Sequence, residues 1–425
     1  MNRALPISMA NLLIGACLTF AQTPKEVPPA TAALPPHDAP PTGLGDHGCS
    51  PLSDSSPATR AGVFTGELEY VLWAFPRRVP GLPAEASDVL GASDTRILQT
   101  LHDDEIDRHI QSGARLTLGY WLTDSNVWTA RNEIPTLGAE ARFFFVGQQT
   151  RRGTDSTSPV IERPFFDVND NTEAAVVIAA PGFGSGILSA VAKESIWGAE
   201  LSAWKNCYYN PLGTIFSVYA MGGLRFLGLD SDVEISSVSV INQDVGGAFA
   251  SLAGSRIDAA ESFTTHNRFY GAEVGVRFEF NTSLVIVDTD LRAAIGTTEE
   301  DLNINGFQFK SQNGTTTTSV GDLFALPSNI GHHHKSQFSQ VPEVDVKFKF
   351  PVGAYCTLTT GLSAMYWTHY LRASEQIDRA VDISQIPNFP AAMGATPTGL
   401  NLPGVAFRQS DLWLLGFSAG AEFRW

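Results

Sequence analysis

The feature that most restricts the fold of this chain is a two-residue repeat in its hydrophobic pattern. The repeat is clearest at 417–425, where the alternating residues are Phe417, Ala419, Ala421, Phe423 and Trp425 on one face and Ser418, Gly420, Glu422 and Arg424 on the other. Side chains of a β-strand point alternately to its two faces, whereas those of a helix repeat every 3.6 residues. One apolar face opposite one charged face is typical of a strand between lipid and water.

The same alternation recurs in nine further segments, so ten strands are predicted. Together they cover 64–72, 114–122, 137–145, 197–203, 216–226, 270–280, 283–295, 343–350, 354–369 and 417–425. The links between them alternate in length, and the long ones lie near 76–111, 148–193, 229–264, 296–337 and 371–410. Membrane barrels have short periplasmic turns and long outer loops. The pattern therefore predicts an all-β fold, a closed antiparallel up-and-down transmembrane β-barrel of about ten strands, within a range of roughly eight to twelve.

The composition agrees with this fold class. Charged residues make up only 17% of the 425 residues, whereas soluble domains have about 25%. The net charge of −16 excludes an unspecific nucleic-acid binder, which needs a basic surface. The four cysteines are too scattered for a disulfide scaffold or a paired zinc site. A bridge from Cys49 to Cys207 or Cys356 stays open.

The first 60 residues divide into a targeting peptide and a linker. Arg3 precedes an apolar run from Met9 to Phe20, and the small residue Ala21 offers a cleavage point, so residues 1–21 are predicted to be a signal peptide. The alternatives are a membrane anchor, although the run is shorter than the ~20 residues that a spanning helix needs, and a lipoprotein cleaved before Cys17. Nine prolines within 22–60 predict a disordered, extended linker. The barrel is expected to occupy 61–425.

One segment could be mistaken for a membrane helix. The stretch from Ala174 to Ala192 has no charged residue and is long enough to cross a bilayer. Pro181 and three nearby glycines interrupt it, which argues against one helix. It is therefore assigned to the second outer loop, with its end extending the strand that carries Trp197.

A Gly-Ala-Glu triplet occurs in four of the predicted strands, at 138–140, 198–200, 271–273 and 420–422. Its Gly and Glu point to the inner face and its Ala to the outer face. The predicted lumen-lining residues are Glu67, Glu69, Arg115, Glu140, Arg142, Glu200, Arg225, Glu273, Arg277, Glu279, Glu422 and Arg424. One interpretation is an ion-sensing lumen. The other, which we favour, is a ladder of Glu–Arg pairs that closes a narrow barrel, because ten strands leave a small pore at best.

Aromatic residues near the strand ends predict the girdles that membrane barrels place at the lipid–water interfaces. The predicted girdle residues are Trp73, Tyr120, Trp197, Trp367, Trp413 and Trp425. Core packing in a soluble β protein is the alternative. Outer-membrane lipid is thus an expected partner. The terminal Trp425 resembles the recognition signal of bacterial outer-membrane barrels, which implies contact with the barrel-assembly machinery.

No residue pattern requires catalysis. His102 beside Asp103 and Asp104 lies in a predicted loop, where a run of charges is typical of a solvated surface. The run from His332 to His334 could hold a metal ion, but three adjacent histidines in a flexible loop rarely form one rigid site. A His-Glu-x-x-His sequence does not occur. We therefore expect no enzymatic activity, no catalytic residue, no metal site and no cofactor.

Several short segments resemble a known family in order and spacing. They are Glu69–Trp73 followed by Pro76, Pro80 and Pro83, then Arg163–Asp167, Ala180–Gly182 and Trp197–Leu201. This pattern is similar to the putative β-barrel porin-7 family of bacterial outer-membrane proteins, except that Ala74 replaces an aromatic residue. The resemblance covers the chain after the linker. It implies a porin-type barrel and an outer-membrane location, with no established substrate and no catalytic residues.

Two function classes follow from these observations. The first is a porin for passive diffusion of small solutes, with a weak preference for cations because acidic residues such as Asp103, Glu299 and Asp301 lie in the predicted loops. The second is a non-conducting structural or surface-interaction barrel that displays extracellular loops. Both are expected in the bacterial outer membrane. The sequence sets neither a solute nor an oligomeric state.

Overall fold

The computed structural model describes residues 61–74, 85–87, 110–123, 135–210, 215–282, 284–388 and 400–425. The predicted signal peptide and linker, at 1–60, and the region of His102 lie outside these ranges. Within them, no helix is long and apolar enough to cross a membrane.

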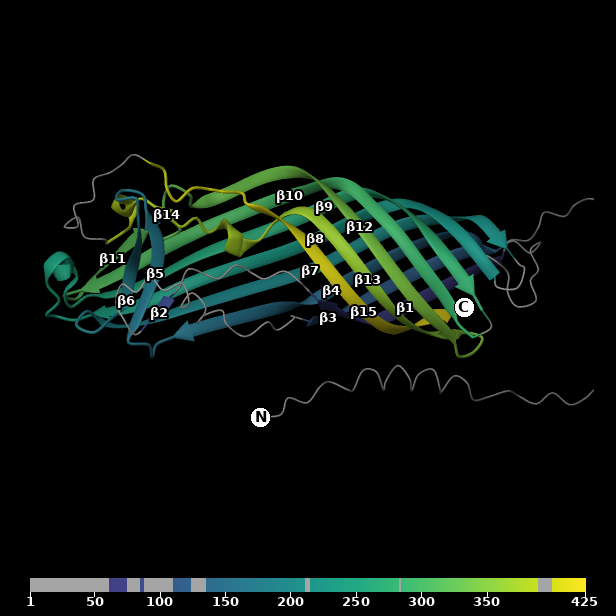
Figure 1. Cartoon of the computed structure of the whole chain (residues 1–425), viewed down its shortest axis with the longest axis horizontal. Coiled ribbons are helices and arrows are strands. Elements are labelled where there is room, and N and C mark those ends of the chain that lie inside the picture. The colour runs from purple at the N-terminus through teal and green to yellow at the C-terminus, as the bar shows by residue number, and fades with distance from the viewer. Residues whose placement is uncertain are drawn as a thin grey trace, which may run out of the picture.

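A closed ring of antiparallel strands dominates the structure (Figure 1). In order around the ring, the strands are β1 (Ala61–Ala74), β3 (Ile110–Thr123), β4 (Pro135–Asp155), β7 (Gly184–Asn210), β8 (Ile215–Ile241), β9 (Arg256–Asn281), β10 (Ile286–Gln312), β12 (Gly331–Pro351), β13 (Cys356–Leu371) and β15 (Gln409–Arg424). Every neighbouring pair is antiparallel. The predicted up-and-down barrel of ten strands is confirmed, and each predicted strand lies within or overlaps one of these ten.

The ring is closed by its first and last strands. β1 pairs with β15 from Thr65 opposite Arg424 to Ala74 opposite Leu415. Beyond that register the Phe64 N–H donates to the Trp425 carbonyl at 3.0 Å, and the Trp425 N–H donates to the Phe64 carbonyl at 3.1 Å. The two edges of the sheet therefore satisfy each other, and closure removes the exposed edges that an open sheet would have.

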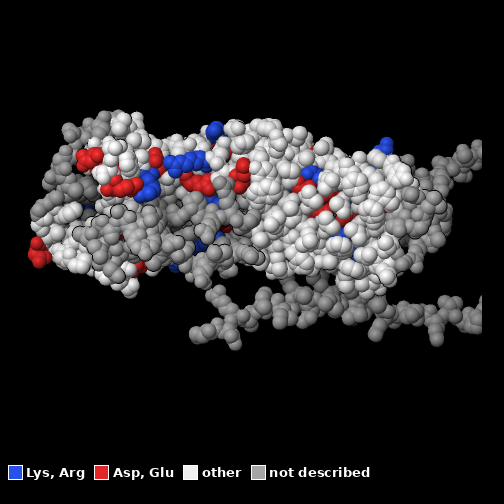
Figure 2. Space-filling model, viewed as in Figure 1, with Lys and Arg blue, Asp and Glu red and all other residues white. Residues whose placement is uncertain are grey.

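The outer surface of the barrel has two zones. Near the end where short turns join β9 to β10 and β12 to β13, which we call the turn end, outward side chains are apolar; Leu118, Leu201 and Leu362 are 50%, 57% and 59% exposed. We call this zone the apolar belt. Toward the opposite loop end the outward side chains become charged. Figure 2 shows this change as a largely white half beside a half that carries most of the charged groups. An apolar outer band of this kind faces lipid.

The strands extend well beyond the belt, so the loops predicted from the sequence are longer than those in the structure. The segments 229–241 and 296–312 were predicted to lie in outer links, but they continue β8 and β10. Their alternation is reversed: Leu229, Val233 and Ile235 point inward and are buried, whereas Asp230 and Glu234 point outward. The reason is that the wall at this level has water outside and folded protein inside.

A second, smaller sheet fills the loop end of the barrel (Figure 1). It is formed by β2 (Glu85–Ser87), β5 (Val160–Asp167), β6 (Thr172–Ala179) and β14 (Ala380–Val381). We call this sheet, with residues 321–330 and the 3₁₀ helices η2 (Ala373–Gln376) and η3 (Ile383–Gln385), the plug. Phe165 and Phe324 of the plug pack with Phe263 and Leu302 of the wall in one buried apolar cluster.

Two elements extend the wall at this end, β11 (Thr315–Val320), which pairs with β10, and η1 (Gly247–Leu252). The charge-free segment 174–192 divides between β6 and β7 around a turn at Gly182, whose φ of 79° favours glycine. The prediction of an interrupted segment that extends the next strand is correct, but most of it is strand and not loop.

Candidate functional site in the barrel lumen

Charged side chains fill the part of the lumen that the apolar belt surrounds. They are inward-facing residues of nine of the ten wall strands, all except β13, and we call them the charged layer. Its members are Glu67, Glu69, Arg115, Glu140, Arg142, Glu200, Arg225, Glu273, Arg277, Glu279, Asp288, Asp290, Arg292, Glu343, Asp345, Lys347, Lys349, Glu422 and Arg424. Strand alternation brings them together, because every second residue of each strand points into the barrel.

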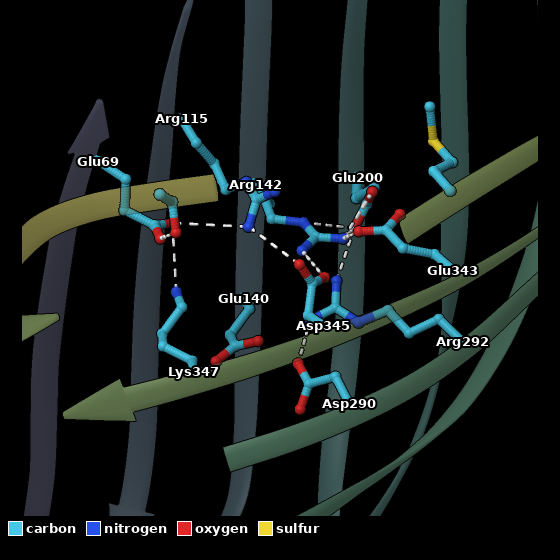
Figure 3. Close-up of polar contacts among 12 residues, drawn as sticks. Glu69, Arg115, Glu140, Arg142, Glu200, Asp290, Arg292, Glu343, Asp345 and Lys347 are labelled. Atoms are coloured by element: carbon cyan, nitrogen blue, oxygen red, sulfur yellow. Dashed lines mark hydrogen bonds and ion pairs between the residues drawn. The ribbon is translucent and has the colours of Figure 1, made fainter. Parts of the chain in front are cut away.

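The contacts of Arg142 extend across the barrel from one wall to the other. Its guanidinium lies 2.8 Å from Glu200 on the neighbouring strand β7. It also lies 2.9 Å from Glu343 and 3.0 Å from Asp345, which both project from β12. In the ring, β4 and β12 are opposite each other. Figure 3 shows Arg142 among these three carboxylates.

Other ion pairs bridge the lumen at neighbouring levels. Arg277 of β9 contacts Glu140 of β4 at 3.0 Å and Asp290 of β10 at 2.7 Å. Lys347 of β12 lies 2.6 Å from Glu67 of β1. Long side chains from many strands therefore form one network in the lumen, rather than separate pairs along the wall.

The centre of the network is closed to solvent. Arg225 is 0% exposed, Glu69 1% and Arg115 2%. A buried charge is costly unless it is paired and hydrogen-bonded, and Arg225 meets this condition through Glu200, Glu273 and Glu343. A water-filled pore would leave inward charges hydrated. This arrangement matches the ladder that closes a narrow barrel, which is the interpretation we favoured from the sequence.

An apolar layer lies directly above the charged layer, toward the loop end. Trp73, Phe144, Phe269 and Trp367 belong to its buried cluster. Inward glycines make room for these rings: Trp73 lies opposite Gly416 and Phe144 lies opposite Gly198 on the paired strands. A Cβ at Gly198 would lie 2.2 Å from the Phe144 ring, so the strand must carry glycine there.

Aromatic rings also close the lumen on the turn-end side of the charged layer. Trp121, Trp204, Tyr219 and Met221 form a buried cluster there, and the Arg277 guanidinium lies 4.1 Å from the centroid of the Trp204 ring. This distance is within the range of a cation–π contact. Charged and aromatic layers thus alternate along the lumen.

The plug is held to the wall by a buried cluster of three charges. Arg163 of β5 pairs with Glu261 of β9 and with Asp322. Glu261 also accepts hydrogen bonds from the backbone N–H groups of Phe324 at 2.9 Å and Ala325 at 3.1 Å. The segment 163–167 that carries the family resemblance therefore anchors the plug.

The structure places all twelve predicted lumen-lining residues on the inner face, although Arg424 is partly exposed near the turn end. Seven further charged-layer residues were missed: Asp288, Asp290, Arg292, Glu343, Asp345, Lys347 and Lys349. Their signal was present, because they occupy the polar face of the same alternation. The alternation cannot predict which charged side chains form ion pairs across the lumen.

The predicted girdle needs a correction. Tyr120, Trp413 and Trp425 point outward and are 39%, 49% and 66% exposed, and Trp197 shares the outward face of β7 with Leu201. Trp73 and Trp367 are 1% and 0% exposed, so their assignment to the girdle was wrong. Each has the parity of the inner face of its strand, and each packs in the apolar layer.

The histidine run lies in β12 and not in a flexible loop. His332 and His334 are exposed on the outer wall beside Asp301, and the His333 ring contacts the Asn329 carbonyl at 2.9 Å. Among the described residues, no group of three or more His, Cys, Asp or Glu side chains could hold a metal ion. Cys207 is free and exposed, and Cys356 is disulfide-bonded.

Comparisons with known proteins agree with the resemblance found in the sequence. A family described as putative beta barrel porin-7 matches residues 68–425. No curated protein matches the chain. The outer membrane protease OmpT from Escherichia coli is 7% identical, with 88% of this chain and 100% of that chain covered and a TM-score of 0.35. The outer-membrane expressed OmpT of Vibrio cholerae is 11% identical, with 87% and 99% covered and a TM-score of 0.15. Likenesses this weak say nothing about function.

Proposed function

The chain belongs to the putative beta barrel porin-7 family, and from this premise we propose that it is an outer-membrane β-barrel with a closed lumen. Its role in this proposal is to anchor the plug and the outer loops at the cell surface, as a structural or surface-interaction protein. We expect no enzymatic activity. This proposal follows the non-conducting alternative of the sequence analysis rather than the open porin.

One observation supports the proposal above the others. The guanidinium of Arg142 reaches carboxylates on the opposite wall at 2.9 and 3.0 Å, while Arg225 at the same level is 0% exposed. A lumen that hydrated solutes could enter would need water between these groups. The apolar layer and the plug add two further closed layers above them.

A gated porin is the second candidate, and the family description favours it. The charged layer contains eleven acidic and eight basic residues, an excess of three negative charges. If the layer opened, this excess would raise the local concentration of cations. In this second candidate the protein passes small cationic solutes by passive diffusion after the plug and the charged layer rearrange.

Planar-bilayer recording of the refolded full chain separates the two candidates. Heat-modifiable gel mobility and flotation with liposomes serve as controls that the barrel is closed and inserted. Under the first proposal, inserted protein produces no discrete current steps at moderate voltage. Reproducible steps with a reversal potential that indicates cation preference would overturn it and support the gated porin.

The proposed partners are outer-membrane lipid, at the apolar belt, and the barrel-assembly machinery, through Trp425. We expect Trp425→Ala to lower the amount of heat-modifiable protein in the outer-membrane fraction. Trp413→Ala is a matched control, because Trp413 is another exposed outward ring. Equal losses in the two variants would argue against a specific role of Trp425.

A further inference from the structure

The plug and the wall line a partly open cavity of about 100 Å³ at the loop end of the barrel. It lies between β6, η1 and the ends of β8 and β9 that extend beyond the apolar belt. Small side chains leave the space: Ala175 on β6, Ser237 and Ser239 on β8, and Ala259 on β9. The cavity is on the other side of the apolar layer from the charged layer, so it is separate from the closed lumen described above.

Most of the cavity wall is apolar. Ile178, Ile241 and Leu252 line it, and each is less than 9% exposed. Phe183 and Phe249 also line it and contact each other edge to face, with ring centroids 5.4 Å apart. Such walls offer a guest dispersion contacts and removal from water, and few hydrogen bonds.

Most polar groups of the wall already have partners, although the buried Nε of Arg163 has none. Gln308 donates to Asp322 at 2.7 Å and accepts from Asn388 at 3.1 Å. Arg163 pairs with Asp322 and with Glu261. Two carboxylates beside one guanidinium leave an excess of one negative charge, so an anionic guest would be repelled. A neutral guest meets no such penalty.

Protein interiors are packed closely, and spaces larger than a water molecule are few. An engineered apolar cavity of about 150 Å³ stays free of water and takes up benzene or xenon. We propose that this cavity binds a small, neutral, apolar molecule no larger than benzene. The site is at the cell-surface end of the barrel, and it does not depend on whether the lumen conducts.

Binding of xenon and benzene to the refolded full chain tests the proposal. We expect a saturable shift of the ¹²⁹Xe resonance with protein concentration, and displacement of xenon by benzene. Ala259→Leu fills the cavity from β9 and is expected to weaken binding at least about tenfold, because the added side chain occupies the space of the guest.

Ala260→Leu is the matched control, because residue 260 adds the same atoms to the opposite, outward face of β9. It should bind like the wild type. Uptake of xenon or benzene by detergent or lipid contributes equally to both variants and therefore does not affect the comparison. Ser237→Leu replaces Ala259→Leu if that variant does not fold. A wild-type response equal to that of the filled variants would overturn the proposal. Silence in bilayer recordings bears only on the proposed function, so the two tests fail independently.

Discussion

Arg142 and Glu343 project from opposite walls of the barrel and lie 2.9 Å apart inside the lumen. In either direction around the ring, four strands separate β4 from β12. Glu343 also contacts Arg225 of β8, so this single carboxylate joins three strands that are not neighbours. At this distance no water molecule fits directly between the two side chains.

Glu343→Gln removes the negative charge between these two guanidinium groups. Loss of one partner from a buried ion pair costs about 3–5 kcal/mol, so we expect the free energy of unfolding to fall by roughly 3 kcal/mol. Urea unfolding of the barrel in lipid vesicles measures it. The control Glu299→Gln removes a carboxylate paired on the outer wall and should cost less than about 1 kcal/mol. Equal losses would contradict a buried network.

Gly198→Ala places a methyl group against the Phe144 ring, where the Cβ would lie 2.2 Å from the nearest ring atom. Overpacking of this kind costs about 1–3 kcal/mol, and the same unfolding assay measures it. Gly222→Ala on the neighbouring strand is the matched control, because nothing lies within 4 Å of its Cβ position. The double variant with Phe144→Leu should recover part of the loss. A loss in Gly222→Ala as large as in Gly198→Ala would mean that the ring contact is not the cause.

Tryptophan fluorescence in brominated lipid tests the corrected girdle. Trp413 is 49% exposed on the outer wall, whereas Trp367 is 0% exposed in the apolar layer. We expect Trp413→Phe to lower the quenched fraction of the emission, because it removes a ring that faces lipid. Trp367→Phe should raise that fraction, because it removes an emitter that lipid does not reach. If Trp413→Phe raised the quenched fraction and Trp367→Phe lowered it, Trp413 would face the interior and Trp367 the lipid, which would contradict the structure.

His334 lies on the outer wall beyond the apolar belt and therefore outside the membrane-spanning part of β12. Its Nδ1 is 2.9 Å from Asp301, and its Nε2 is 3.0 Å from Glu299. The hydrogen bond with Asp301, together with the charges of Asp301 and Glu299, raises the pKa of His334 above its ordinary value. The resulting stabilisation is complete below the pKa of the unfolded state and is lost as the pH rises through the higher folded pKa.

An NMR titration of the histidine ring signals measures this midpoint. Asp301→Asn should lower it, because the main hydrogen-bonded carboxylate is gone. Asp230→Asn, which acts on His266 on the same outer wall, should leave the titration of His334 unchanged. An identical midpoint in Asp301→Asn and the wild type would show that the contact does not persist in solution.

The barrel could be predicted because one physical rule governs every strand inside the belt. Lipid outside and polar contacts inside force the alternation seen in Phe417 to Trp425. The short turns leave the apolar residues of the next strand on the outward face. The same rule led us to predict the parts of the wall beyond the belt as loops. Beyond the belt Asp230 points outward and Val233 inward, so the alternation continues with its polarity reversed. A segment searched for apolar outward residues is then mistaken for a loop.

The candidate site was predictable only in its parts. Parity assigned residues such as Glu200 and Arg225 to the inner face, and the parity of Trp73 also pointed inward, although its place near a strand end suggested a girdle. The partner of Arg142 across the lumen depends on the number of strands and on their stagger around the ring. These are properties of the closed ring that no single strand contains. The plug is beyond such reasoning, because β5 pairs with β2 and β14 from distant links.

The seam between β1 and β15 has a consequence for biogenesis. β1 is the first wall strand of the chain and β15 is the last, so the ring cannot close before β15 is available for pairing. Until then the two edge strands have unpaired backbone N–H and C=O groups, which need other hydrogen-bond partners. Closure of the barrel therefore depends on its last strand as much as on its first, although the two are more than 300 residues apart in the chain.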